Sequence, residues 1–466
     1  MNLKRLFLLS LLAVFAFQQN VIAQLRIPNF FSDHMVLQRG TEINFWGLAP
    51  ASSEIKIVGT WFQDTVKAKT NGDGQWRTTL PEGKAGGPYE IKIMANQESI
   101  TLKDILLGDV FLCSGQSNME WGAAQNLKEI IDEMPNANNP NIRLLHISRN
   151  GALTPQDQIS NQWATLSAES LKPFSAIGYF IAKEINAQEN VPIGVINSSW
   201  GGTAAEVWTP SYLIENDPFL LQRAKLQGAN DWRPHNSGVL WNAMVHPFAG
   251  YNISAAFWYQ GESNVGTWDG YDKLMKTMIN SWRSAWNDDF PFYFVQIAPF
   301  QYNNKEPLAA YLREQQAKTA TELPNTGMVV ITDLVDNIKD IHPIQKKAVA
   351  KRLADLALAE VYHKPLKDYK SPIYKSQEIK GNSIEISFSN LEGKLTSKGE
   401  ITDLFIAGAD QQFKPAKGKI KGDKLIVESA EVRNPVAVRF GFTEIAMPNL
   451  FNSNGLPVSP FRTDQW

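Results

Sequence analysis

The sequence predicts a central α/β domain with a mainly parallel sheet, flanked on each side by a region rich in β-strands. Two observations favour the central domain. Apolar runs of four to six residues recur between residues 108 and 365, and stretches with helical spacing separate them. Continuous apolar runs are typical of strands buried on both faces of a parallel sheet, and strand–helix alternation is typical of an α/β fold.

Size and composition indicate an ordinary folded protein. The chain has 466 residues, which suits two or three domains, with 43% hydrophobic and 20% charged residues. The net charge of −2 shows no basic excess, so nucleic acid is not expected as a partner. The single cysteine, Cys113, can form no internal disulfide and is expected to be a buried packing residue.

The first 23 residues resemble a secretory signal peptide. A positive start at Lys4-Arg5 precedes an apolar stretch from Leu6 to Phe17, and small or apolar residues follow at Val21–Ala23. The twelve-residue stretch is too short to span a bilayer. We therefore expect a mature protein that starts near Gln24, is exported to the periplasm or the medium, and does not insert into a membrane.

Residues 24–107 are expected to form a small β-sandwich. Polar and apolar residues alternate along Glu42–Trp46, Glu54–Ile57 and Glu90–Ile93, and Asn71–Gly74 is a strong turn signal. Period-two runs with turns between them are typical of sandwiches of this size.

Residues 108–365 are expected to form the α/β domain. Five apolar runs predict its strands: Val110–Cys113, Ile193–Ile196, Ala255–Tyr259, Phe292–Ile297 and Met328–Ile331. Amphipathic helices are expected around Ile177–Ile185 and after Pro343. Polar or small residues follow four of these strands: Ser117, Asn197–Gly202, Gln260–Asn264 and Asp333–His342. Because sites in open α/β sheets form outside the carboxyl ends of the strands, these four loops should converge.

Residues 366–466 return to a β pattern. Strands are expected at Ser383–Phe388, Leu404–Ile406, Leu425–Val427 and Val436–Phe440, with a turn at Gly422-Asp423.

Ser117 is the candidate nucleophile. It follows a predicted buried strand within Gly115-Gln116-Ser117-Asn118-Met119, and a tight turn there would expose its hydroxyl. A serine hydroxyl needs a base, and His342 is the best-placed histidine because it follows the last strand at the same sheet edge.

A carboxylate should orient the base and raise the pKa of His342. Asp340 is the nearest candidate, and Asp336, Asp333 and Glu262 are alternatives.

The oxyanion of an acyl-transfer intermediate also needs donors. The candidates are the backbone N–H of Ser117, a backbone N–H at Gly201-Gly202, and the side-chain amide of Gln260 or Asn264.

Aromatic side chains near these loops could stack on a sugar or belong to the core. They are Trp121, Trp200, Trp208, Trp258 and Tyr259, and core packing is favoured for Trp258 because it lies inside a strand. No metal-ligand spacing and no phosphate-binding or dinucleotide motif is present, so neither a metal nor a cofactor is expected.

Four motifs in order carry a resemblance to a known family. Gly115–Met119, Ser199–Thr203, Trp258–Asn264 and Asp340–Pro343 together resemble the sialate O-acetylesterase family of SGNH-type carbohydrate esterases. The start, Phe31–Gln38, and the end, Gly455–Arg462, are similar to that family too. The resemblance implies an SGNH-hydrolase-like, flavodoxin-like sheet domain and a metal-independent serine esterase that removes acetyl groups from sugar hydroxyls.

The resemblance also implies site residues. Ser117 matches the nucleophile, His342 the base, and Gly202 with Gln260–Asn264 the oxyanion region. SGNH hydrolases usually place the acid three residues before the histidine, where this chain has Lys339, so the third member of the triad stays open.

Sialic acid is the expected sugar, with acetylated xylan or another plant glycan as the alternative. A lipase-like esterase would need a large apolar pocket. A non-catalytic glycan-binding protein would need neither Ser117 nor His342.

Overall fold

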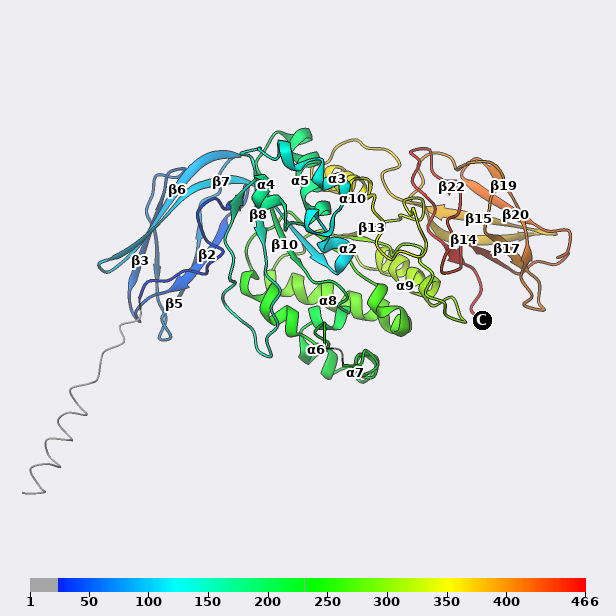
Figure 1. Cartoon of the computed structure of the whole chain (residues 1–466), viewed down its shortest axis with the longest axis horizontal. Helices are drawn as coiled ribbons and strands as arrows, with labels where there is room; N and C mark the ends of the chain where they lie inside the picture. Colours follow the sequence, from blue (N-terminus) through cyan, green and yellow to red (C-terminus); the bar gives the residue numbers. More distant parts are fainter. Residues whose placement is uncertain (1–23, 230) are drawn as a thin grey trace, which may run out of the picture.

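A computed structural model of the chain describes residues 24–229 and 231–466. The predicted signal peptide, residues 1–23, lies outside the described residues. Three parts lie in a row: a β region near the N-terminus, a central α/β part, and a β region at the C-terminus (Figure 1). Within the described ranges, no helix combines the length and the apolar character needed to cross a membrane.

The first part consists of two small sheets. Its strands are β1 (Val36–Gln38), β2 (Ile43–Leu48), β3 (Glu54–Gly59), β4 (Val66–Lys69), β5 (Gln75–Leu80) and β6 (Gly86–Ala95). One sheet pairs β2 with β5. In the other, β3 pairs with β4 and β6, and both β6 and β1 pair with β7 (Glu98–Gly115). The strands predicted around residues 42–46, 54–57 and 90–93 are confirmed. The predicted turn at Asn71–Gly74 joins β4 to β5, and the Asn71 carboxamide oxygen accepts hydrogen bonds from the backbone N–H groups of Asp73 and Gln75.

One long strand, β7 (Glu98–Gly115), belongs to both the first and the central part. Its first half pairs antiparallel with β6, from Glu98 to Leu107. Its second half pairs in parallel with both β10 (Ile193–Ser199) and β11 (Ala255–Tyr259) in the central sheet. The boundary expected at residue 107 therefore falls inside a continuous strand, which ties the first part directly to the strand that leads to Ser117.

The central sheet has six parallel strands and one antiparallel edge strand. Besides β7, its strands are β8 (Ile142–His146), β9 (Ala164–Thr165), β10 (Ile193–Ser199), β11 (Ala255–Tyr259), β12 (Phe292–Val295) and β13 (Thr326–Val329). The spatial order is β13-β12-β11-β7-β10-β8-β9. When the parallel strands are numbered along the chain, this order is 2-3-1-4-5-6, which differs from the flavodoxin order 2-1-3-4-5.

The sequence pattern missed β8 because a charged residue interrupts its apolar run. Arg143 lies inside the strand with only 3% of its surface exposed. Its guanidinium forms two hydrogen bonds to the carboxylate of Asp104, at 2.5 and 3.0 Å. A buried arginine is tolerated when a carboxylate pairs with it, so this strand contains a charge that a hydrophobic pattern excludes.

Helices cover both faces of the central sheet (Figure 1). α5 (Ala176–Glu189) and α10 (Lys346–Glu360) pack on one face with Phe111 and Cys113 of β7, so Cys113 is buried as expected. α8 (Tyr271–Trp286) and α9 (Leu308–Glu322) cover the other face, with Val110 and Leu112. The shorter helices are α2 (Ser117–Glu120), α3 (Lys128–Ile131), α4 (Ala168–Leu171), α6 (Ser211–Glu215) and α7 (Pro218–Lys225).

The C-terminal region has a hydrophobic core of its own, while the core of the first part is continuous with the central one. The four strands predicted for the C-terminal region are confirmed as β15 (Ser383–Ser389), β17 (Leu404–Ala407), β20 (Lys424–Glu428) and β21 (Ala437–Phe440). The region also contains β14 (Ile373–Lys380), β16 (Thr396–Ser397), β18 (Lys414–Pro415), β19 (Lys417–Lys421), β22 (Leu450–Phe451) and β23 (Phe461–Arg462).

Three central strands end at the same level. Gly115, the last residue of β7, pairs with Ser199 of β10 on one side and with Tyr259 of β11 on the other. After β7 the chain forms β8 and β10 on one side of it, and then crosses to β11, β12 and β13 on the other, so the sheet changes its winding direction at β7. This is the position where open α/β sheets place their binding sites.

Candidate active site

Ser117 occupies a tight turn directly after the central strand. Gly115, two residues before Ser117, has φ +133°, and a β-carbon built on it would lie 2.2 Å from the carbonyl oxygen of Tyr259. Only glycine fits there, because the backbone conformation and the close approach both exclude a side chain. The chain then enters α2 at Ser117, whose side chain is half-buried at the sheet edge.

The structure brings Ser117 and His342 together although they lie 225 positions apart. His342 Nε2 lies 2.9 Å from Ser117 Oγ, which is a hydrogen-bond distance. The imidazole is stacked on the ring of Trp121, with centroids 3.7 Å apart and planes at 19°. The expectation that these two loops converge is therefore confirmed, and Trp121 fixes the plane of the imidazole.

Asp340 is the carboxylate nearest to the other ring nitrogen. Its Oδ1 lies 3.5 Å from His342 Nδ1, and 53% of its side chain is exposed. The same oxygen accepts a 2.9 Å hydrogen bond from the backbone N–H of His342. The distance to Nδ1 suits an ion pair rather than a short hydrogen bond, so the contact is weaker than that of a buried triad acid.

The three alternative carboxylates have other partners. Asp333 forms two hydrogen bonds to Arg352, at 2.8 and 2.6 Å. Asp336 accepts a 3.0 Å hydrogen bond from Gln345. Glu262 accepts one from the side chain of Asn118. Asp340 alone of the four is within ion-pair distance of His342.

The environment of His342 lowers the pKa of its imidazole. Burial is the largest cause, and the nearby charge of Lys346 acts in the same direction. Asp340 opposes both but does not outweigh them. Asp340 thus raises this pKa, as expected of a carboxylate, but the net shift is downward because burial and the Lys346 cation outweigh it.

The turn Gly201-Gly202 packs against Ser117. A β-carbon on Gly201 would lie 3.2 Å from the β-carbon of Ser117, so only a very small residue fits beside the nucleophile. The N–H of Gly201 donates to the carboxylate of Glu120 at 2.9 Å. Gly202 has φ +73°, and its N–H has no hydrogen-bond partner among the described residues. The backbone N–H groups of Ser117 and Gly202 therefore stay as candidate oxyanion donors.

Gln260 and Asn264 do not fit the oxyanion role expected for them. The Gln260 amide donates to the carbonyl oxygen of Thr203 and to the side-chain oxygen of Asn264. The Asn264 amide donates to Glu206 and Thr267. Both side chains are fully buried, and these bonds use all four of their N–H groups, so none is left for an intermediate at Ser117.

Glu120 is a site residue that the sequence pattern did not reveal. It is 8% exposed, and its carboxylate receives two hydrogen bonds from Arg149, at 2.6 and 2.7 Å, besides the one from Gly201. The Arg149 guanidinium also lies 5.7 Å from the ring of Trp200. In the sequence, the only indication of this role was that Glu120 lies three residues after Ser117. Glu120 connects the nucleophile turn to the glycine turn.

The five aromatic candidates divide into two groups. Trp208, Trp258 and Tyr259 are buried in the core, as favoured for Trp258. Trp121 and Trp200 are half-buried and lie at the site, against His342 and Arg149 respectively.

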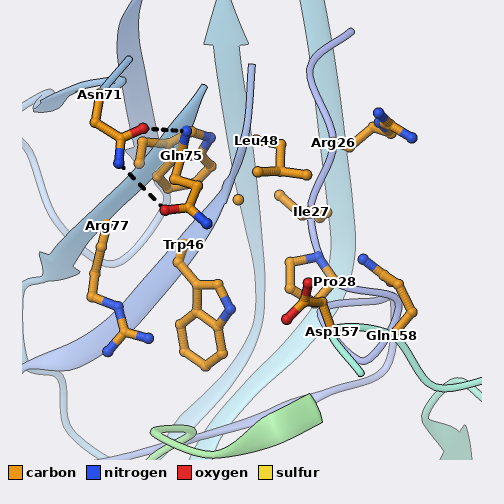
Figure 2. Close-up of a pocket in the computed structure, with 12 residues that line it drawn as sticks. Arg26, Ile27, Pro28, Trp46, Leu48, Asn71, Gln75, Arg77, Asp157 and Gln158 are labelled. Atoms are coloured by element: carbon orange, nitrogen blue, oxygen red, sulfur yellow. Dashed lines mark hydrogen bonds between the residues drawn. The ribbon is translucent and has the colours of Figure 1, made fainter. Parts of the chain in front are cut away.

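A separate cavity of about 340 Å³ lies at the edge of the first β region (Figure 2). Trp46 and Arg77 line one side, and Asp157 and Gln158 line the other. It contains no residue of the Ser117 site.

In residues 24–229 and 231–466, no group of three or more His, Cys, Asp or Glu side chains could hold a metal ion.

Several known proteins are similar to this chain in sequence or in structure. A family model described as carbohydrate esterase, sialic acid-specific acetylesterase matches residues 107–359. The chain is 29% identical to sialate O-acetylesterase from Homo sapiens over 392 residues, covering 76% of this chain and 74% of that protein. It is 28% identical to the enzyme of the same name from Rattus norvegicus, covering 76% and 77%. A carbohydrate acetylesterase structure from Xanthomonas citri aligns with TM-score 0.86 and 34% identity, over 95% of this chain and 100% of that one.

Proposed function

The chain belongs to the sialic acid-specific acetylesterase family of carbohydrate esterases and is a carboxylic ester hydrolase, and from this premise we propose that it removes O-acetyl groups from sialic acids through Ser117 and His342. The observation that carries the proposal is the 2.9 Å contact between Ser117 Oγ and His342 Nε2. Two groups so far apart in the chain meet at the edge where the central strands end.

The reaction follows from this geometry in two steps. Ser117 Oγ attacks the acetyl carbonyl carbon while His342 Nε2 takes the hydroxyl proton. The N–H groups of Ser117 and Gly202 donate to the resulting oxyanion. The intermediate collapses, and the sugar oxygen leaves with the proton from His342. Water, deprotonated by the same nitrogen, then releases acetate from Ser117.

Asp340 completes the proposed triad as the acid next to His342.

The order of the four motifs along one sheet edge supports the finer assignment to the SGNH type. Residues 24–107 and 108–365 share one hydrophobic core, while the core of residues 366–466 supports a separate β region. The basic and apolar start of the chain supports export to the periplasm or the medium.

A cation near the site that forms no direct salt bridge supports an acidic sugar rather than a neutral one. Arg233 donates a 2.6 Å hydrogen bond to the carbonyl oxygen of Gly202, next to the nucleophile. Among the described residues, no carboxylate lies within salt-bridge distance of Arg233, although the buried carboxylate of Glu206 attracts it from farther away. Sialic acids carry a carboxylate, which a guanidinium binds well. A neutral acetylated xylan offers no such group.

The proposal is tested by acetate release from three substrates: an O-acetylated sialic acid, its methyl ester, and acetylated xylo-oligosaccharides. We expect the free acid to have the highest kcat/KM and the methyl ester a lower one. Fastest release from the neutral xylo-oligosaccharides would contradict the sialic acid assignment. Equal rates for the acid and its ester would remove the role of Arg233. No release from any sugar, together with no hydrolysis of 4-nitrophenyl acetate, would contradict the proposed site.

A further inference from the structure

A chain of three buried polar side chains lies directly behind Ser117 and His342. Lys346 Nζ donates a 2.6 Å hydrogen bond to the side-chain oxygen of Asn118. The Asn118 amide in turn donates a 2.7 Å bond to Glu262. The exposed fractions are 1% for Lys346, 0% for Asn118 and 8% for Glu262. They come from α10, from α2 and from the short helix that follows β11, so they join three segments distant in sequence.

Asn118 connects the two loops that carry the reacting groups. It directly follows Ser117, and its amide also donates a 3.0 Å hydrogen bond to the carbonyl oxygen of Ile341, the residue before His342. Its side chain thus makes three hydrogen bonds: one through its oxygen and two through its nitrogen. A fully bonded amide in a buried position restrains both neighbours, because breaking any bond leaves a buried polar group unsatisfied.

Lys346 is a buried cation four residues after His342, at the first position of α10. Removing an ammonium group from water costs several kcal/mol unless opposite charge and hydrogen bonds offset it. Here ionised Glu262 supplies the opposite charge across Asn118, although burial raises the pKa of its carboxyl group against the opposing effects of Asn118 and Lys346. The ring of Tyr259 lies 5.6 Å from the ammonium. A methionine would fill such a position without this cost, so a functional reason for the charge is favoured.

We propose that Asn118, Lys346 and Glu262 form a positioning cluster that holds His342 against Ser117 and keeps its imidazole neutral in mildly acidic solution. The proposal rests on the roles of Ser117 and His342 given above. Asn118 fixes the distance between the two loops, and the Lys346 cation disfavours a second positive charge on the imidazole. The negative charge of Glu262 offsets part of the cost of burying the Lys346 cation.

The charges around His342 agree in sign with this role. Lys346 from α10 lowers the pKa of His342, and Asp340 on the histidine's own loop raises it. Lys346 itself faces Glu262, Asp340 and Glu129, and burial lowers its pKa to about 7. Lys346 is therefore mainly protonated over the acidic range in which His342 titrates. Removing its charge should raise the pKa of His342.

The test compares the pH dependence of kcat/KM in three proteins: the wild type, Lys346→Met and Lys347→Met. Lys347 is the next residue but is exposed, so its replacement makes the same change in net charge without touching the cluster. We expect the acid limb to move up by about 0.5–1 pH unit in Lys346→Met, as a like charge close to an imidazole requires. The acid limb of Lys347→Met should coincide with that of the wild type.

A merely structural lysine would lower activity or stability without moving the acid limb. An unchanged midpoint in a folded Lys346→Met protein would therefore overturn the proposal. If that variant does not fold because Glu262 is left uncompensated, Lys346→Met combined with Glu262→Gln removes both charges and keeps the shape of residue 262. The double variant should show the same upward movement, and its absence there would also overturn the proposal. A wild type with no acid limb would instead contradict His342 as the base.

Discussion

The two flanks of His342 differ in burial and in the number of segments that form them. On one flank, Asp340 comes from the same loop, is 53% exposed, and lies 3.5 Å from the ring. On the other, the positioning cluster comes from three separate segments and is almost completely buried. Coulombic interactions are weak at exposed sites and strong at buried ones. The buried cluster therefore has more influence on His342 than the exposed carboxylate two residues away.

Removing the nucleophile should have the largest effect, because both flanks of His342 affect catalysis only by way of the proton that His342 takes from Ser117. We expect Ser117→Ala to lower kcat roughly 10⁴-fold or more, as the loss of a serine nucleophile does elsewhere. The melting temperature should change little, since the half-buried hydroxyl contributes little packing. Turnover of 4-nitrophenyl acetate and a thermal melt check both parts. Turnover near that of the wild type would place the nucleophile elsewhere.

Disrupting the buried flank should have the second largest effect. Asn118→Ala removes the bonds to Lys346, Glu262 and Ile341 at once. We expect kcat to fall about 10²-fold, as it can when positioning is lost, and the melting temperature to fall because buried charges lose their partner. Steady-state kinetics and calorimetry measure the two. A small loss of activity with a large loss of stability would make Asn118 structural only.

Disrupting the exposed flank should cost less. Exposed ion pairs contribute about 1 kcal/mol or less, so Asp340→Asn should lower kcat by about fivefold or less. The loss of a buried triad acid costs roughly 10⁴-fold in a well-studied case. Asp333→Asn and Asp336→Asn, whose carboxylates bind Arg352 and Gln345, serve as matched controls. A 10⁴-fold loss in Asp340→Asn would mean that the exposed flank dominates after all.

The pH profile of the wild type sharpens the comparison. His342 must be neutral to accept the serine proton, and its pKa is lowered. The acid limb of kcat/KM should therefore lie below pH ~6.5, the value for a free histidine. A limb above that value would show that Asp340 outweighs burial and Lys346.

Changes in the separate cavity should have the smallest effect. Arg77→Gln alters the pocket in Figure 2, which shares no residue with either flank. We expect kcat/KM for 4-nitrophenyl acetate to stay within about twofold of the wild type. A larger loss would indicate that this cavity and the Ser117 site are coupled.

The sequence predicts the parts of this site that follow strand ends. Ser117, Gly202 and His342 could be found because a strand pattern precedes each loop and the carboxyl ends of parallel strands share one edge. Period-two alternation also predicted some strands of the two flanking β regions, such as β3 and β15, but not all of them. β8 was missed because Arg143 interrupts its apolar run, and its partner Asp104 lies in another strand.

The finer assignments depend on contacts that no local pattern contains. Gln260 and Asn264 look like oxyanion donors in the sequence, but Glu206, Thr203 and Thr267 bind their amides in the fold. Lys346 looks like an ordinary helical lysine, since only packing shows that it is buried. Pairing between distant side chains decides both cases, and a single sequence does not record it.

The most direct test of the central claim is to map the residue that a serine-directed organophosphonate labels. Treated enzyme is digested, and peptide masses locate the phosphonyl group in the wild type and in Ser117→Ala and His342→Ala. We expect inactivation of the wild type with one label on Ser117, none at that position in Ser117→Ala, and much slower labelling in His342→Ala, because the hydroxyl then lacks its base. Inactivation with the label on another residue, or equally fast labelling of Ser117 without His342, would contradict the account.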